Sequence, residues 1–254
     1  MPDGLAFAVL GSSSIGNALV VESGQTRVLV DAGFFTQTLE QRVAGLARYF
    51  QVFEAIMVTH VHLDYCRGVP RLSNRDRLPA WLTPDLQAAI RSEPVYACQL
   101  YSPHESFAIG VLEFCSYPMP HDAHEPAQSV VGDGDQEFGV LTDAGYVTLH
   151  RRNVLDNCIA LLIEANHDAD LLTRSPYPGQ LKRQVDGHQE HLSNQQAAEL
   201  PAQLNTDWLR HIVVTHTSKK ITRICGTALS PMGLAVHQNG YRSPMSTKAS
   251  DGAI

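Results

Sequence analysis

Residues 55–66 read AIMVTHVHLDYC, and this stretch is more informative about the fold than any other part of the chain. Its first five residues are apolar or β-branched, which is typical of a buried strand. The strand ends at His60, and His62 and Asp64 follow at intervals of two. In an extended segment, side chains two residues apart leave the backbone on the same side. The stretch therefore predicts a strand that delivers two imidazoles and a carboxylate to one edge of a sheet.

Two imidazoles and a carboxylate form a donor set that suits zinc, and manganese or iron less selectively. A His-x-His pair alone is more often part of a polar loop with two exposed histidines. Here the preceding buried strand, the following aspartate and similar strand ends elsewhere favour a metal site.

Several other apolar runs also end in a residue that can bind a metal or transfer a proton. The runs TRVLVD, FGVLTD and IVVTH end at Asp31, Asp143 and His216. The run IALLIEANHD passes Glu164 and then reaches His167. Rigid strands fix the loops beyond their ends, and α/β proteins place their sites in such loops. We therefore expect these side chains to converge at one sheet edge.

Short apolar runs bounded by Gly, Pro, Asn or Asp recur along the chain and predict strands. These runs are residues 5–10, 18–22, 27–31, 55–59, 111–117, 129–131, 139–143, 159–164 and 211–215. Helical patterns lie between several of them, at residues 37–49, 84–91 and 194–204. Ser193 precedes the last pattern with Gln196 three positions on, which is a capping-box sequence. Interleaved strands and helices predict a mixed α/β protein.

Two short segments occur twice in the same order. VLVDAG at 28–33 matches VLTDAG at 140–145, and IMVTH at 56–60 matches IVVTH at 212–216. Chance is a fair alternative, because buried strands use few residue types. The ordered repetition nevertheless favours two related halves, each a sheet covered by helices.

The composition sets the remaining bounds. The 254 residues, 44% of them hydrophobic, can form one domain, and we expect it over residues 1–242 with a flexible tail at 243–254. A net charge of −7 indicates no general polyanion-binding surface. Five cysteines without a Cys-x-x-Cys pair indicate a reducing compartment. With no signal-peptide pattern and no apolar run of membrane-spanning length, we expect a cytoplasmic protein without a membrane partner. The oligomeric state stays open.

The sequence resembles the metallo-β-lactamase superfamily, whose motif is His-x-His-x-Asp-His after a buried strand. Within it the likeness is greatest to the YycJ-like (WalJ-like) bacterial exonucleases, relatives of tRNase Z and of phosphodiesterases. It covers most of residues 5–218 and rests on VLGSSSIGNALVVE, LVDAG, THVHLDY, PHDAHEP, VLTDAG, EANHD and HLSNQQAAEL. The resemblance implies a four-layer αββα sandwich, with two mixed sheets inside and helices on the outer faces. It also implies a metal-dependent hydrolase.

The resemblance also implies a set of metal ligands. The first ion would be held by His60, His62 and His121. The second would be held by Asp64, Asp143 and His216, with Asp143 bridging. The two ions would share a hydroxide and hold the reacting phosphoryl oxygens.

Two of these assignments had competitors. His124 is an available neighbour of His121 in PHDAHEP, and His121 is preferred because it matches the family position directly after the strand. Asp31 matches a family aspartate that supports the site, so we expect it to orient a ligand and not to bind the metal.

One position departs from the family motif. Tyr65 stands where the family has its second-metal histidine. A neutral phenol is a poor ligand unless the metal removes its proton. Cys66 follows, but its side chain should face elsewhere. We therefore expect one firmly held ion, and a second that is weak, exchangeable or absent.

The catalytic candidates are Asp64, His191, Glu164 and His167. His191, in HLSN, resembles the histidine that tRNase Z-like enzymes use near the leaving group. Glu164 or His167 could orient its imidazole. His191 could equally be a helix-entry residue before Ser193.

The function expected from this resemblance is hydrolysis of a phosphodiester, in DNA or RNA. Metal spacing alone equally allows hydrolysis of small esters, lactones, thioesters or β-lactams. A different alternative is a catalytically weakened relative kept as a binding scaffold. It is motivated by Tyr65, by Glu190 where the family has Gly, and by the absence of the family's Asn-rich stretch after His216.

Overall fold

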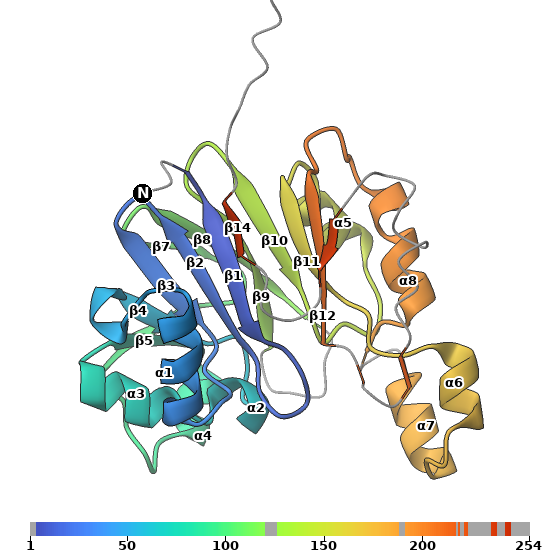
Figure 1. Ribbon diagram of the computed structural model, residues 1–254, viewed down its shortest axis with the longest axis horizontal. Helices are drawn as coiled ribbons and strands as arrows, with labels where there is room; N and C mark the ends of the chain where they lie inside the picture. The colour runs from blue at the N-terminus through green and yellow to red at the C-terminus, as the bar shows by residue number, and fades with distance from the viewer. Residues whose placement is uncertain are drawn as a thin grey trace, which may run out of the picture.

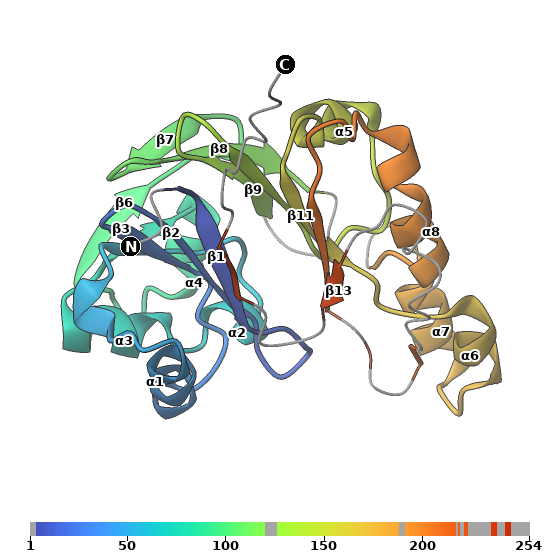
Figure 2. The same cartoon turned by 45° about the horizontal axis from the view of Figure 1, so that its top comes forward.

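Two stacked β-sheets with helices on their outer faces form the protein (Figures 1 and 2). The computed structural model describes residues 4–119, 126–187, 191–216, 218 and 221–222, and the backbone of two further strands at 235–237 and 242–244. The order of layers is helix, sheet, sheet, helix. This confirms the four-layer αββα architecture. Among the described residues, no helix combines the length and apolarity needed to cross a bilayer.

The first sheet has the strand order β14-β1-β2-β3-β4-β5-β6. Its strands are β14 (Arg242–Pro244), β1 (Ala6–Gly11), β2 (Ala18–Ser23), β3 (Thr26–Val30), β4 (Ala55–Met57), β5 (Pro79–Leu82) and β6 (Ala97–Leu100). The helical elements of this half are α1 (Thr36–Gly45), the 3₁₀ turn η1 (Phe50–Val52), α2 (Leu63–Cys66), α3 (Val69–Asp76) and α4 (Pro84–Ala89).

The second sheet has the strand order β13-β12-β11-β10-β9-β8-β7. Its strands are β7 (Ser106–Ile109), β8 (Leu112–Pro118), β9 (Ala127–Gly132), β10 (Glu137–Leu141), β11 (Ala160–Glu164), β12 (His211–Thr215) and β13 (Ala235–His237). Its helical elements are α5 (Leu149–Leu155), α6 (Ala169–Arg174), α7 (Gly179–Val185), α8 (Asn194–Glu199) and the 3₁₀ turn η2 (Pro201–Gln203).

The two sheets have the same succession of strand directions. Counted from β14 in the first sheet and from β7 in the second, three antiparallel pairings are followed by three parallel ones. β3 and β10 hold the same position, so the repeated segments VLVDAG and VLTDAG, with Asp31 and Asp143, lie at equivalent strand ends. The second repeated segment is not equivalent, because β4 adjoins β3 whereas β12 is separated from β10 by β11. The likeness of IMVTH to IVVTH reflects buried parallel strands in different positions.

Successive side chains of each strand point to opposite faces of the sheet and so enter different cores. Phe7 and Val9 of β1 belong to the core between the sheets, whereas Ala8 and Leu10 belong to the core beneath the outer helices. The rings of Phe7 and Phe138 stack across the sheets with centroids 4.2 Å apart. A third core lies under α5 and α8 on the second sheet. The strands β1, β3 and β11 are buried along their whole length, so their sequences are nearly continuous apolar runs. The strands β6, β7 and β8, at or next to the sheet edges, carry exposed residues.

The expected strands and helices are present. The three helices end earlier than expected, whereas β2 and β9 are longer than the apolar runs that predicted them. The Ser193 cap and its partner Gln196 form the predicted capping box. One boundary differs, since Ser243 and Pro244, expected in the flexible tail, belong to β14 and pair with β1. That pairing is long-range, so no local pattern near residue 243 signals it. The rest of the expected tail, residues 245–254, lies outside the described residues.

Candidate metal centre and active site

The ends of β3, β4, β10, β11 and β12 bring the candidate residues together at one edge of the sandwich. Three of these residues, Asp31, Asp143 and His216, have left-handed backbones with φ of 63°, 52° and 50°. This conformation is costly for a residue with a side chain, and such residues cluster at functional sites. Each strand is followed here by a sharp turn that redirects the chain at the residue carrying the functional group.

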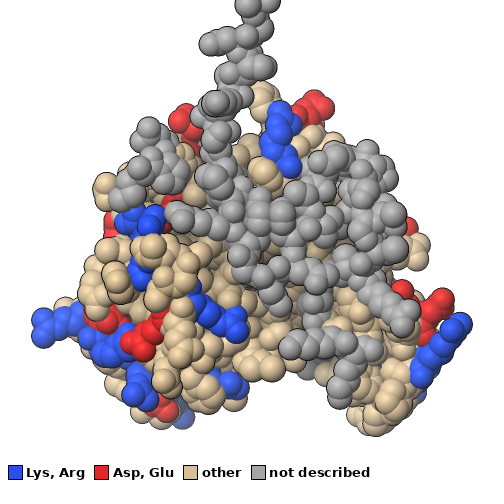
Figure 3. All heavy atoms as spheres, in the orientation of Figure 1, with Lys and Arg blue, Asp and Glu red and all other residues tan. Residues whose placement is uncertain are grey.

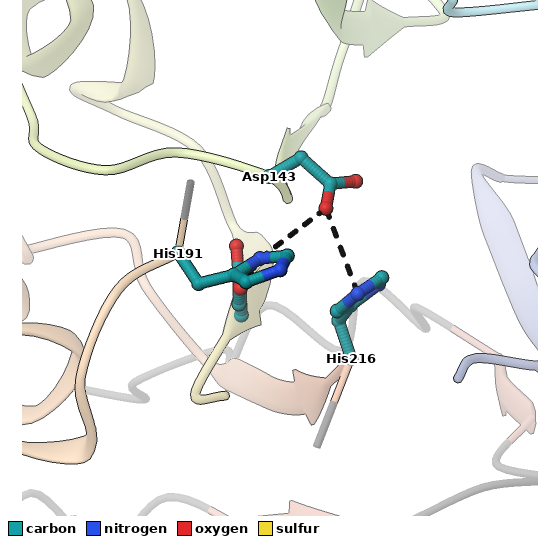
Figure 4. Close-up of side chains that lie close together, drawn as sticks. Asp143, His191 and His216 are labelled. Atoms are coloured by element: carbon teal, nitrogen blue, oxygen red, sulfur yellow. Dashed lines mark ion pairs between the residues drawn. The ribbon is translucent and has the colours of Figure 1, made fainter. Parts of the chain in front are cut away.

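Asp143 is the centre of the cluster. Its Oδ1 lies 3.6 Å from His216 Nε2 and 3.4 Å from His191 Nδ1, and its Oδ2 lies 3.9 Å from His60 Nε2. Figure 4 shows the imidazoles of His191 and His216 both turned towards this carboxylate. Asp143, His60 and His216 are buried, and His191 is half-buried.

The separations around Asp143 fit ligands that share an ion. Two donors that each lie about 2.1 Å from a tetrahedral zinc ion are about 3.4 Å apart. The distances of 3.6 and 3.9 Å from His216 and His60 are too long for hydrogen bonds, yet the nitrogens face the carboxylate oxygens. Ligand atoms of Asp143, Glu164, His191 and His216 also lie within 4.8 Å of one another. The donor set therefore fits a divalent metal ion.

His62 and Asp64 lie on the outer side of this cluster. His62 is the residue before α2, is half-buried, and has its ring centroid 5.0 Å from that of His60. The carboxylate of Asp64, in the first turn of α2, accepts a hydrogen bond of 3.2 Å from Asn17 Nδ2. The pKa of Asp64 is raised, mainly because the carboxylate is partly buried. His121 and its competitor His124 lie outside the described residues, so the third ligand of the first ion stays a prediction.

Asp31 acts on His60 through Thr59. Asp31 Oδ1 accepts hydrogen bonds from the Thr59 backbone N–H at 2.9 Å and from its hydroxyl at 3.0 Å. Thr59 Oγ1 lies 2.9 Å from His60 Nδ1. Because the hydroxyl proton is directed to Asp31, His60 Nδ1–H donates to Thr59 and Nε2 keeps its lone pair towards Asp143. This contact accords with the expectation that Asp31 orients a ligand.

Tyr65 points directly into the site. Its side chain is only 2% exposed, and its hydroxyl donates to Asp143 Oδ2. The hydroxyl oxygen of Tyr65 also lies 3.0 Å from His216 Nδ1. Burial, reinforced by the charge of Asp143, raises the pKa of Tyr65 well above its ordinary value. Cys66 faces elsewhere, as expected, because its thiol contacts the Val61 carbonyl and packs in the outer core.

Glu164, and not His167, is the partner of His191. Glu164 Oε1 lies 2.6 Å from His191 Nδ1, and its Oε2 accepts a 3.2 Å hydrogen bond from the Ala144 backbone N–H. His167 instead lies 3.4 Å from Asp186. Burial is the largest cause that lowers the pKa of His167. The choice left open by the sequence is thus decided by geometry in favour of Glu164.

Three polar residues outside the ligand motifs hold the site together. Ser12 Oγ donates to Asn17 Oδ1 at 2.8 Å and accepts from the His216 backbone N–H at 2.9 Å. Asn166 Nδ2 donates to the His216 carbonyl at 3.1 Å. Ser12 and Asn17 belong to the GSSSIGN turn between β1 and β2, where no helix follows. In EANHD, Asn166 lies between Glu164 and His167, which are stronger candidates by residue type, so the sequence did not single it out.

Asn17 provides a test of this support. Asn17→Ala removes the amide that binds the Asp64 carboxylate and carbonyl. Loss of such outer support typically costs 10–100-fold in metal affinity, and we expect a loss of that size in a chelator competition titration. Ser14→Ala, an exposed serine in the same turn, is the matched control and should bind metal as the native protein does. Equal affinities in the two variants would contradict the supporting role of Asn17.

A cavity of about 410 Å³ adjoins the cluster. His191 and His216 form part of its wall, and Ser13, Ser14 and Ile15 of the β1–β2 turn line it from the first half. Tyr177, Leu181 and Val185, in and just before α7, line it from the second half. Its volume lies in the range of small-molecule binding pockets. Two side chains of the metal cluster, His191 and His216, are therefore accessible to a ligand from a partly apolar cavity.

A sandwich of two such sheets, with histidine and carboxylate ligands at one edge, is the arrangement of a metal-dependent hydrolase with the metallo-β-lactamase fold. The chain belongs to this superfamily. The model of the family described as "Beta-lactamase superfamily domain" matches residues 26–217.

Two relatives and one solved structure show the extent of the likeness. Exodeoxyribonuclease YycJ of Bacillus anthracis is 30% identical over 219 residues, which cover 85% of this chain and 83% of that protein. Exodeoxyribonuclease WalJ of Streptococcus pneumoniae is 28% identical over 223 residues, with the same coverage of 85% and 83%. The metallo-β-lactamase fold protein YhfI of Bacillus subtilis superposes with a TM-score of 0.70 at 14% identity, covering 95% of this chain and 99% of that one.

Proposed function

We propose that this protein is a metal-dependent phosphodiesterase that hydrolyses DNA. The convergence of His60, His216 and His191 on the Asp143 carboxylate is the observation that carries the proposal. The two relatives with the exodeoxyribonuclease names span most of the chain, and their names support a DNA substrate. Zinc suits the donor set best, with manganese or iron as alternatives, and a cytoplasmic location accords with the free cysteines.

The residues of the site would divide the work as follows. His60, His62 and Asp143, with His121 by resemblance, would hold the first ion. A bound divalent ion supplies Lewis-acid polarisation of the phosphoryl oxygens and lowers the pKa of water. His191 would hold the proton that the leaving oxygen needs, because its Nδ1 is anchored 2.6 Å from Glu164 and its ring lines the cavity. Glu164 would fix the ring orientation and stabilise the imidazolium.

A local group of arginines would let the surface bind a polyanion. Seven arginines lie between residues 42 and 91, and all are exposed or half-buried. On the face drawn in Figure 3, blue side chains gather mainly over the helices of the first half. Arginine contacts to phosphates supply affinity without sequence preference. These side chains could bind the DNA backbone although the net charge of the chain is −7.

The test is hydrolysis of bis-(p-nitrophenyl) phosphate and of DNA by the metal-loaded protein and by two carboxylate variants. Glu164→Gln keeps the shape of the side chain but removes the charge beside His191. Loss of general acid–base assistance typically costs 10²–10⁴-fold, so kcat should fall within that range with unchanged metal content. The alkaline limb of the kcat–pH profile should move to lower pH, because the general acid loses the neighbouring negative charge that favours its protonated form.

Asp186→Asn is the matched control, because Asp186 is an exposed carboxylate beside the other buried histidine, His167. Its activity should equal that of the native protein. If Glu164→Gln loses metal, Glu164 and His191 are ligands and their role in proton transfer is wrong. If the native protein cleaves neither substrate at any metal loading, phosphodiester hydrolysis itself is wrong.

The alternative of a catalytically weakened scaffold is favoured by one observation, the phenol of Tyr65 inside the cluster. Glu190, which also motivated it, lies outside the described residues. Metal analysis separates the two proposals. A protein that binds no ion and cleaves no phosphodiester would be a scaffold, whereas one firmly held ion with hydrolysis supports the enzyme.

A further inference from the structure

The hydroxyl of Tyr65 connects the two halves of the sandwich at the candidate metal centre. Its ring comes from α2 of the first half, and its oxygen contacts Asp143 after β10 and His216 after β12 of the second. The Tyr65 ring also lies 4.0 Å from that of His60, centroid to centroid. The Tyr65 side chain is buried, and its hydroxyl lies between the two residues that, by resemblance, would hold the second ion.

The single proton of the hydroxyl fixes the protons around it. A phenol has one O–H donor, and here it is directed to Asp143 Oδ2. The 3.0 Å contact with His216 Nδ1 is then a hydrogen bond that the imidazole donates to the phenol oxygen. His216 is thereby held as the Nδ1–H tautomer, and its Nε2 lone pair faces Asp143 Oδ1 at 3.6 Å.

We infer that Tyr65 is a positioning residue that bridges Asp143 and His216 and, standing where the family motif has an imidazole, leaves a second metal ion with too few donors to be held firmly. The inference rests on the metal-dependent hydrolysis proposed above, and it specifies the stoichiometry of that site. The phenol donates to Asp143 Oδ2 and accepts from His216 Nδ1–H, so of these two side chains only Oδ1 and Nε2 remain as donors for a second ion. Position 65 adds no imidazole to them. The centre then holds one ion firmly.

Metal stoichiometry and the protonation pattern of His216 test this inference without reference to activity. The native protein, saturated with zinc and passed through a desalting column, should retain one ion per chain by mass spectrometry. Nitrogen-15 NMR should show His216 as the Nδ1–H tautomer. In Tyr65→Phe the bridge is lost, so we expect one ion still, held 10–100-fold more weakly, and a mixture of His216 tautomers.

Tyr65→His supplies an imidazole where the family motif has one, and its stoichiometry should rise towards two ions per chain. Tyr49→Phe removes an exposed phenol and is the control, with native metal content and tautomer. Two ions held firmly by the native protein would overturn the inference. A tyrosinate absorption band that appears on metal loading of the native protein, and is absent from Tyr65→Phe, would also overturn it, because Tyr65 would then be a ligand.

Discussion

His62→Ala is expected to abolish tight binding of the first metal ion, and with it all hydrolytic activity, while the fold stays largely intact. The imidazole belongs to the three-histidine set that the resemblance implies, and the methyl group of alanine has no nitrogen lone pair to bind a metal. His62 is half-buried at the start of α2, outside the hydrophobic cores, so its removal costs little packing. His60 would be a poorer choice, because it is 1% exposed and its loss would leave a cavity. The measurement is metal content after purification, together with thermal unfolding of the metal-free proteins.

His104→Ala is the matched control, because His104 is an exposed histidine far along the chain from the cluster. It should keep the metal content, activity and unfolding temperature of the native protein. An unchanged metal stoichiometry in His62→Ala would refute the assignment of His62 as a ligand. A collapse of the unfolding temperature in that variant would instead assign His62 a structural role.

The second large effect is expected at Gly33, which lies where the chain after β3 passes under the metal-binding turn. A Cβ at this position would come 1.7 Å from the carbonyl oxygen of Asp64 and 2.8 Å from the backbone nitrogen of Tyr65. Both contacts are with backbone, which cannot rotate away. Gly33→Ala must therefore displace α2, and we expect about 3 kcal/mol of lost stability, at the upper end for overpacking. The displacement should also weaken metal binding, since Asp64 and Tyr65 move with α2.

Gly45→Ala is the control for the added methyl group. Gly45 is the last residue of α1, and a Cβ there would meet no atom within 4 Å. Alanine is the better helix former by roughly 0.5–1 kcal/mol, so this variant should be as stable as the native protein or slightly more so. Chemical denaturation of the two variants gives the comparison. Equal stability of Gly33→Ala and the native protein would show that α2 is not packed against this glycine.

The sequence determined the strand ends and the residue types that they carry. His60, Asp143 and His216 could each be placed at the end of a buried strand, because apolar runs and their polar ends are local features. The position of Tyr65 in the family's ligand motif was equally visible, since the motif spans only a few consecutive residues. The layered fold followed from the interleaving of strands and helices together with the resemblance to the superfamily.

Only the tertiary structure decided how these side chains pair. The sequence could not choose between Glu164 and His167 as partners of His191, because the 2.6 Å contact depends on how α8 approaches the end of β11. Similarly, the Tyr65 hydroxyl meets residues 78 and 151 positions away, and Ser12 meets a backbone N–H 204 positions away. Such contacts arise where two sheets stack and bring distant strand ends to one edge. Local patterns set which groups reach that edge, whereas the packing of the sheets sets which of them touch.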